Sequence, residues 1–200
     1  MSSPTQQDGN IGGETETLYF AYGSNLSLGQ LGRRCPSSRF IGRGVLLRHK
    51  WQINARGYAN IYPSKGDWVE GLCFLLNSED EGFLDISEGV AQGSYIKEKK
   101  EIQLFPGHAS LVGRKVREVD VKLKSLATGN RSLESSGETS ETMECLVYVS
   151  PGPTYPDGMP KREYLGRMGA GIRDAAKLGM KEEYYFKYLA PTMKGRYTLF

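Results

Sequence analysis

Glu88 is the residue whose type and position best suit proton-transfer chemistry. An S-x-x-E capping pattern beginning at Ser78 predicts a helix, and Glu88 comes just before Gly89, which is expected to end it. A carboxylate at a helix C-terminus meets the negative end of the dipole, and burial adds a desolvation cost, so both effects raise its pKa. Such a group can accept and return a proton near neutral pH. From the residues alone, an ordinary surface glutamate beside a helix-ending glycine stays the favoured interpretation.

A second candidate feature is the bend Gly23-Ser24-Asn25. It follows an aromatic, β-prone stretch over residues 17–22 and precedes a short helix expected over residues 27–34. A strand that runs into such a bend at a helix start directs several backbone N–H groups toward one point, and this geometry binds anions. Gly23 by itself is equally explained as a residue that permits the turn.

The common signatures of metal, cofactor or nucleophile catalysis are missing from the sequence. His49 and His108 lack metal-ligand spacing, and there is no G-x-S-x-G pattern, P-loop or G-x-G-x-x-G after a strand. We therefore expect no metal and no cofactor. Cys35, Cys73 and Cys145 lie far apart, and no apolar N-terminal run indicates secretion, so free thiols in a reducing compartment are expected.

The elements that must position these residues are mostly strands, with a few inserted helices. Strands are predicted over residues 17–22, 40–48, 51–54, 59–62, 68–76, 95–104, 116–123 and 145–149. Helices are predicted over residues 27–34, 78–88, 161–178 and 182–189. The second helix is expected to turn Phe83, Leu84 and Ile86 inward. Because strands and helices do not alternate regularly, we predict an α+β fold around a small mixed β-barrel or strongly curled sheet, flanked by helices.

Composition indicates one soluble domain. Residues 1–15 are polar and are interpreted as a disordered leader to a single domain over residues 16–200. Residues 125–142, rich in Ser, Thr, Gly and Glu, are expected to form a mobile loop. No segment approaches the ~20 apolar residues of a membrane-spanning helix. The net charge of +3 is not concentrated, so we expect a cytoplasmic protein that binds neither nucleic acid nor membrane.

Three segments resemble, in the same order, motifs of the γ-glutamyl cyclotransferase family. The first is LYFAYGSNL at residues 18–26, which is similar to the family's Tyr-Gly-Ser-Asn signature. The second is LDISEGV at residues 84–90 with GSY at residues 93–95, which resembles the family's segment with a catalytic glutamate and a nearby tyrosine. The third is Met159-Pro160 with Tyr164 and Leu165. The similarity spans about residues 17–189 and implies a small β-barrel with helices packed around it.

The resemblance also implies roles for individual residues. Glu88 would be the general acid/base. The residues that would bind the γ-glutamyl group or line its pocket are Tyr19, Phe20, Ala21, Tyr22, Gly23, Ser24, Asn25, Tyr95 and Tyr164. For Phe20 an ordinary core position is the preferred interpretation, and Tyr22 and Tyr95 also suit ordinary strand positions.

The reaction implied by the resemblance releases 5-oxoproline from a small γ-glutamyl amide. The substrate's own α-amine attacks its γ-carbonyl, so the protein supplies no nucleophile, and a held geometry contributes ~7–11 kcal/mol. Glu88 would take a proton from the α-ammonium group and return one to the departing nitrogen. Backbone N–H groups of the bend would hold the α-carboxylate and the oxyanion.

Several alternatives remain open. The leaving amine could come from glutathione, a γ-glutamyl amino acid or a γ-glutamyl amine, or from a glutathione adduct of sulfur-containing secondary metabolism if residues 125–142 open the site. A non-catalytic descendant could bind a γ-glutamyl metabolite, although the retained Glu88 counts against it. A late aromatic group is interpreted as packing or as the face of a homodimer; it consists of Tyr184, Tyr185, Phe186 and Tyr188.

Overall fold

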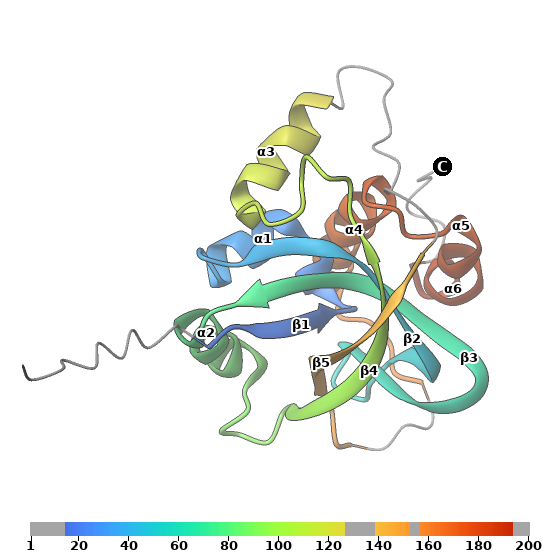
Figure 1. Ribbon diagram of the computed structural model, residues 1–200. Helices are drawn as coiled ribbons and strands as arrows, with labels where there is room; N and C mark the ends of the chain where they lie inside the picture. Colours follow the sequence, from blue (N-terminus) through green and yellow to red (C-terminus); the bar gives the residue numbers. More distant parts are fainter. Residues whose placement is uncertain (1–14, 127–138, 153–156, 194–200) are drawn as a thin grey trace, which may run out of the picture.

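The chain forms a closed five-stranded barrel flanked by helices, seen in the computed structural model of Figure 1. The structure describes residues 15–126, 139–152 and 157–193. The strand order is β1-β3-β2-β4-β5. The strands are β1 (Thr17–Ala21), β2 (Arg39–Ile53), β3 (Ala59–Leu76), β4 (Ile96–Pro106) and β5 (Glu141–Val149). Neighbouring strands are antiparallel except β1 and β5, whose parallel pairing closes the barrel. The predicted α+β barrel is confirmed.

The helices lie outside the barrel (Figure 1). Their bounds are η1 (Ser24–Leu26), α1 (Leu28–Arg34), α2 (Ser78–Glu88), α3 (Val116–Leu126), α4 (Arg162–Lys177), α5 (Glu182–Tyr184), η2 (Tyr185–Leu189) and α6 (Ala190–Met193). Helices α1, α3 and α4 contact one another along one side, and α4 also contacts η1, the short turn after β1. No helix in the described ranges is long and apolar enough to span a membrane.

Two paired glycines make room inside the barrel for a large side chain of β1. Gly44 and Gly71 face each other across β2 and β3. A Cβ atom at Gly44 would lie 2.8 Å from the ring of Phe20, and one at Gly71 would lie 2.7 Å from it. Phe20 is fully buried. Its close fit against these glycines shows that Phe20 fills the barrel core, as the preferred sequence interpretation has it.

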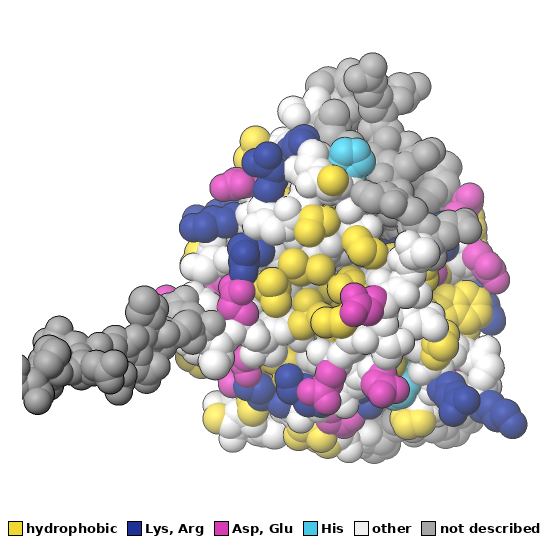
Figure 2. Space-filling view, in the orientation of Figure 1, with side chains coloured by type: hydrophobic (Ala, Val, Ile, Leu, Met, Phe, Trp, Pro, Cys, Tyr) yellow, Lys and Arg dark blue, Asp and Glu magenta, His cyan; other side chains and the backbone are white. Residues whose placement is uncertain are grey.

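On one face of the molecule, positive and negative surface charges are mixed (Figure 2). Lys97, for example, forms ion pairs with both Glu81 and Asp85, the latter at 3.1 Å. This face therefore differs from the single-sign stripe that is typical of a nucleic-acid-binding surface.

One predicted strand is wrong, because residues 116–123 belong to helix α3. Val116, Val119 and Leu123 are buried, whereas Val121 is 67% exposed. Burial at i, i+3 and i+7 is the helical period, and the β-branched residues in this stretch had favoured a strand. Tertiary packing of the apolar stripe thus overrides the local propensity.

Helix α2 also differs in detail from the prediction. Asn77 caps it in place of Ser78, and the Asn77 side-chain oxygen accepts a hydrogen bond from the Asp80 N–H at 2.9 Å. Leu84 is buried as expected, but Phe83 is 45% exposed and Ile86 is 78% exposed, so their predicted inward orientation is wrong. Only a narrow stripe of this short helix meets the barrel.

The end of α2 is as predicted. Gly89 follows Glu88 with a φ of 67°, in the left-handed region that glycine adopts without strain.

Both ends of the predicted loop over residues 125–142 belong to regular secondary structure. Ser125 is helical in α3, and β5 begins at Glu141. Residues 127–138, and residues 1–14 of the predicted leader, lie outside the described residues.

Gly71→Ala is expected to destabilise the protein. The new Cβ would lie 2.2 Å from the backbone oxygen of Ala21, so β1 and β3 must separate locally. Such overpacking costs ~1–3 kcal/mol of unfolding free energy, which urea denaturation measures. The control is Gly82→Ala in α2, where nothing lies within 4 Å and the helix should gain about 0.5–1 kcal/mol. Equal stability of Gly71→Ala and the parent protein would contradict the assigned packing.

Candidate active site

A cavity of about 280 Å³ lies where the bend after β1, the end of α2 and helix α4 meet. The residues that line it are Tyr19, Tyr22, Gly23, Ser24, Asn25, Arg34, Arg56, Tyr58, Ala59, Ile86, Ser87, Glu88, Gly89, Ser94, Tyr95, Tyr148, Tyr164 and Arg167. The bend and Glu88, which the sequence presented as separate features, therefore share one cavity. Among the lining residues that the structure describes, Glu88 alone carries a carboxyl group.

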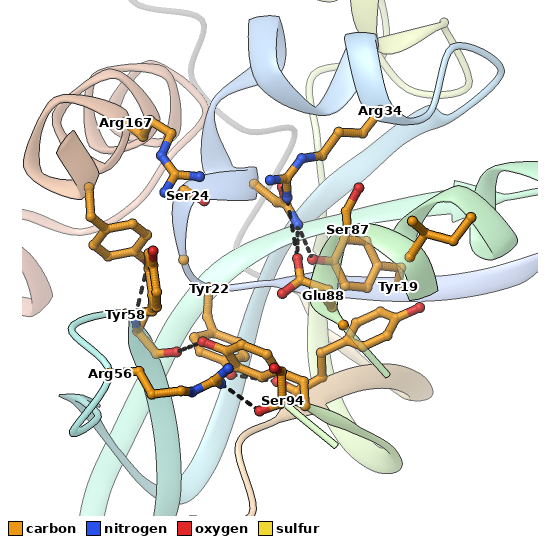
Figure 3. Close-up of a pocket in the computed structure, with 18 residues that line it drawn as sticks. Tyr19, Tyr22, Ser24, Arg34, Arg56, Tyr58, Ser87, Glu88, Ser94 and Arg167 are labelled. Carbon is orange, nitrogen blue, oxygen red and sulfur yellow. Dashed lines mark hydrogen bonds and ion pairs between the residues drawn. The ribbon is translucent and has the colours of Figure 1, made fainter. Parts of the chain in front are cut away.

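The contacts that hold the Glu88 side chain are made by one of its carboxyl oxygens, Oε1. Its Oε1 accepts a hydrogen bond from Asn25 Nδ2 at 3.0 Å and lies 3.4 Å from Arg34 Nη1 (Figure 3). The Glu88 side chain is 16% exposed. Within the described part of the chain, Oε2 has no protein partner, so its lone pairs remain available to a ligand in the cavity.

The Asn25 side chain is fixed on both sides. Its Nδ2 also donates to the Tyr19 hydroxyl at 3.0 Å. Its Oδ1 accepts from Gln30 Nε2 at 3.0 Å and from Arg34 Nη1 at 2.9 Å. Because the Gln30 amide and the Arg34 guanidinium group both donate to Oδ1, the Asn25 amide must turn its N–H donors toward Glu88. The bend thus presents a donor, rather than an acceptor, to the carboxyl group.

Burial raises the pKa of Glu88 above the ordinary glutamate value, because desolvation disfavours the charged form. The Arg34 charge, the Asn25 hydrogen bond and the more distant charges of Arg167 and Arg56 oppose this rise in part. Glu88 is the last residue of α2, so its charge meets the negative end of the helix dipole, as predicted. This interaction also disfavours the charged form of the carboxyl group. The carboxyl group of Glu88 therefore keeps its proton to a higher pH than an ordinary glutamate does.

The hydrogen bonds inside the bend leave some of its backbone N–H groups unused by the turn. Leu26 N donates to Gly23 O at 3.0 Å and Ser27 N to Ser24 O at 3.1 Å, so these bonds use the later N–H groups. The N–H groups of Gly23 and Asn25 are not engaged by the turn, whereas the Ser24 N–H interacts with the Tyr164 hydroxyl. A lining segment with N–H groups of this kind suits an anion or a developing oxyanion.

Tyr95 and Tyr164 are locked in the cavity wall by one backbone residue. The Tyr95 hydroxyl donates to Ala59 O at 2.7 Å, and the Ala59 N–H donates to the Tyr164 hydroxyl at 3.2 Å. Both side chains are buried. Both residues line the cavity, and the substrate-binding role that the resemblance implied for them stays a prediction.

Two of the predicted binding residues do not line the cavity. Phe20 points into the barrel, and Ala21 is fully buried and pairs with Leu72 in the sheet. The prediction included both because they stand within a continuous motif. Alternation along β1 turns Phe20 to the side opposite the cavity-lining Tyr19.

Sequence reasoning missed the arginines of the cavity. Arg34 comes from α1, Arg56 from the connection between β2 and β3, and Arg167 from α4. No spacing relates them to the bend or to Glu88, since only the fold brings these segments together. Tyr58 and Tyr148 were missed as well, whereas Ser87 and Ser94 stood within quoted motifs but were given no role.

Comparisons with known proteins find similarity to proteins named γ-glutamylcyclotransferase. No family model matches the sequence. A mouse protein named γ-glutamylcyclotransferase is 37% identical over 100 residues, which cover 44% of this chain and 53% of the relative. A human protein of the same name is 36% identical over 93 residues, covering 42% and 50% of the two chains. The chain thus spans about half the length of the curated relatives it matches.

The fold comparison extends further along the chain. A solved structure titled γ-glutamyl cyclotransferase matches with a TM-score of 0.62 and 23% identity, covering 92% of both chains. At that identity the likeness concerns the fold alone. The likeness in sequence and the likeness in fold together confirm the predicted resemblance of this chain to the γ-glutamyl cyclotransferase family.

Proposed function

We propose that the protein is a γ-glutamyl cyclotransferase that releases 5-oxoproline from a small γ-glutamyl amide, with Glu88 as the general acid/base. The observation that carries the proposal is the 3.0 Å hydrogen bond between Asn25 and Glu88, which puts a carboxyl group beside a bend suited to bind anions. The printed names of the mouse and human relatives support the same activity.

The proton balance of the reaction needs a single carboxyl group. Glu88 accepts a proton from the substrate's α-ammonium group, and the freed amine forms a bond to the γ-carbonyl carbon. The protonated Glu88 then donates to the departing nitrogen as its bond to that carbon breaks. In the whole cycle the α-nitrogen gives up two protons and the leaving amine gains two, so Glu88 returns to its starting state.

The remaining work is to hold and fold the substrate. N–H groups of Gly23 and Asn25 are suited to the α-carboxylate and to the oxyanion on the γ-carbon, and one oxyanion donor is worth ~3–4 kcal/mol. Hydrogen bonds to Ala59 fix the hydroxyls of Tyr95 and Tyr164, so these two side chains form a rigid part of the cavity wall. A substrate held in the bent form needed for ring closure reacts faster without any protein nucleophile.

Glu88→Gln is expected to reduce 5-oxoproline release by roughly 100-fold or more, because the amide cannot shuttle a proton. The glutamine side-chain oxygen can still accept from Asn25, so the melting temperature and substrate affinity should change little. Mass spectrometry of 5-oxoproline and calorimetric binding measure the two effects. Undiminished release by this variant would refute the assignment of Glu88.

The activity is expected to fall as the pH is lowered. The fall should occur at a higher pH than for an enzyme whose base is an ordinary glutamate with a pKa of ~4.3. The carboxylate form must accept the proton, and burial raises the pKa of Glu88, so this form is lost earlier as the pH drops.

Arg34→Gln is expected to move that acid limb of kcat/KM to still higher pH, because the Arg34 charge lowers the pKa of Glu88. Arg33→Gln, on the exposed side of the same helix, is the matched control and should leave the limb in place. A pH–rate profile of each variant measures the position of the acid limb. An unchanged or lower acid limb in Arg34→Gln would show that Arg34 does not act on Glu88.

Gly23→Val is expected to raise KM by roughly 10-fold or more, because the bend must stay open to bind an anion. A Cβ at this position would lie 3.0 Å from the Tyr164 hydroxyl and 3.2 Å from the Ala59 Cβ, so the larger side chain displaces the wall. Gly29→Ala in α1, with its nearest neighbours at 3.7 Å, is the control. Normal steady-state KM in Gly23→Val would place substrate binding elsewhere.

A further inference from the structure

Helix α2 carries Glu88 but buries little apolar surface. Of its residues, all of which the structure describes, only Asp80 and Leu84 are buried. Phe83 is 45% exposed and Ile86 is 78% exposed. An apolar stripe this narrow does not by itself fix the rotation of a helix about its own axis. Polar contacts must therefore determine the direction in which Glu88 points.

Two carboxylates, one in the first turn and one in the last, tie α2 to the rest of the protein. In the first turn, Asp80 Oδ2 accepts a hydrogen bond from the Ser37 N–H at 3.0 Å. In the last, Asp85 Oδ1 accepts a hydrogen bond from the Tyr148 hydroxyl at 2.5 Å, which joins α2 to β5. Asp85 and Glu88 are three positions apart, so they lie on the same side of the helix. The contact to β5 is therefore made beside Glu88.

The bond between Asp85 and Tyr148 has the features of a strong hydrogen bond. A hydroxyl that donates to a carboxylate forms a short, charge-assisted bond of ~2.5–2.7 Å. Tyr148 is buried, and desolvation together with the Asp85 contact raises the pKa of its hydroxyl, so this group stays a donor. A buried donor that loses its acceptor bears the cost of its desolvation. The structure therefore favours an α2 that stays rotated toward Tyr148.

Tyr148 also contacts two tyrosines of the segment that leads into the bend. Its ring packs edge-on against the ring of Tyr19, with the ring centroids 5.8 Å apart. Its backbone oxygen accepts a hydrogen bond from the Tyr22 hydroxyl at 2.5 Å. Tyr148 thus connects α2 to the segment that carries the bend, in addition to the direct contact between Asn25 and Glu88.

Asp85 itself is not part of the cavity wall. Among the described residues it does not line the cavity, and its side chain is 32% exposed. An effect of Asp85 on a reaction in the cavity must therefore pass through α2 or through Tyr148. Rotation of a helix by roughly 20° moves an atom at a side-chain radius of ~5–6 Å by roughly 2 Å. A displacement of ~1 Å at a reacting group can cost ~100-fold in rate.

We propose that Asp85 is a positioning residue: through its hydrogen bond to Tyr148 it fixes the rotation of α2 and holds Glu88 against Asn25. The kinetic consequence rests on the proposed function, because only then does a displaced Glu88 lower the rate. The location of Glu88 beside the bend does not depend on that function, and it can be measured without turnover.

The other contact of Asp85 supplies a control. Asp85 Oδ2 lies 3.1 Å from Lys97 Nζ, and Lys97 also pairs with Glu81, one turn earlier in α2. The Lys97 side chain is 33% exposed, so water and salt screen these ion pairs, whereas Tyr148 is buried. Lys97→Gln removes both ion pairs and keeps the bond to Tyr148. It is expected to leave kcat within about threefold of the parent value.

Tyr148→Phe removes the hydroxyl and keeps the ring. It is expected to lower kcat for 5-oxoproline release by roughly 10- to 100-fold and to change KM by less than about threefold, because the bend stays intact. Asp85→Ala should have the same effect, and since Asp85 does not line the cavity, its loss cannot come from a contact with substrate. The double variant should lose no more than the larger single loss, because both changes break one bond.

Asp85→Asn is the conservative variant. Its side-chain oxygen can still accept a hydrogen bond from the Tyr148 hydroxyl, although the charge is gone. Its kcat should therefore lie within about threefold of the parent value, well above that of Asp85→Ala. Circular dichroism verifies that each variant is folded. Should Asp85→Ala not fold, Tyr148→Phe and Asp85→Asn still give the comparison.

The location of Glu88 is measured by NMR titration of its isotope-labelled carboxyl carbon, without substrate. The Arg34 charge lowers the pKa of Glu88, so Arg34→Gln raises it in the parent protein. In the Tyr148→Phe background this rise should shrink to less than about half, because a displaced Glu88 no longer lies beside Arg34. In the Asp85→Asn background the rise should be retained. The remaining cations that act on Glu88, which no variant alters, are Arg56 and Arg167.

Several outcomes would overturn the proposal. One is a Tyr148→Phe variant with the kcat of the parent, and another is a full effect of Arg34→Gln on the pKa of Glu88 in that background. A loss in Lys97→Gln as large as in Tyr148→Phe would show that ion pairs hold the helix instead. A parent protein that releases no 5-oxoproline would refute the proposed function, while the NMR titration would still decide the role of Asp85.

Discussion

The contact between the Asn25 amide and the Glu88 carboxyl group is the interaction on which the site depends. It joins the bend after β1 to the last residue of α2, two segments that are 63 residues apart in the chain. Hydrogen bonds from α1 fix the Asn25 amide, and the last turn of α1 also supplies the cation nearest to Glu88. Burial raises the pKa of this carboxyl group, and the Arg34 charge and the Asn25 hydrogen bond oppose that rise in part.

The barrel makes this contact possible, and its general form could be predicted from the sequence. Strand β1 lies between β3 and β5, and Phe20 anchors it against Gly44 and Gly71, so the bend emerges at a defined end of the barrel. Turn residues and β-prone runs indicated most of these strands. The stretch that became α3 was assigned wrongly because Val-rich segments suit a strand locally, and only the neighbouring helices α1 and α4 decide which of its residues are buried.

The candidate site was predictable only as far as local motifs reach. Glu88 before Gly89 and the bend carry a local signal, Tyr95 and Tyr164 were assigned through the family resemblance, and all of them line the cavity. Arg56 and Arg167 carry none, because a lone arginine in a turn or on a helix is usually a surface residue and its role depends on long-range packing. Burial likewise could not be assigned along α2, where exposed Phe83 and Ile86 have the same character as buried Leu84.

The most direct measurement of the central claim is the fate of a γ-glutamyl amide incubated with the protein in water labelled with the heavy oxygen isotope. Intramolecular attack by the α-amine predicts 5-oxoproline and free amine in equal amounts, with no label in the 5-oxoproline. Labelled glutamate would instead show that water is the nucleophile, and intact substrate would show that no such reaction takes place. Either of these two results would contradict the account.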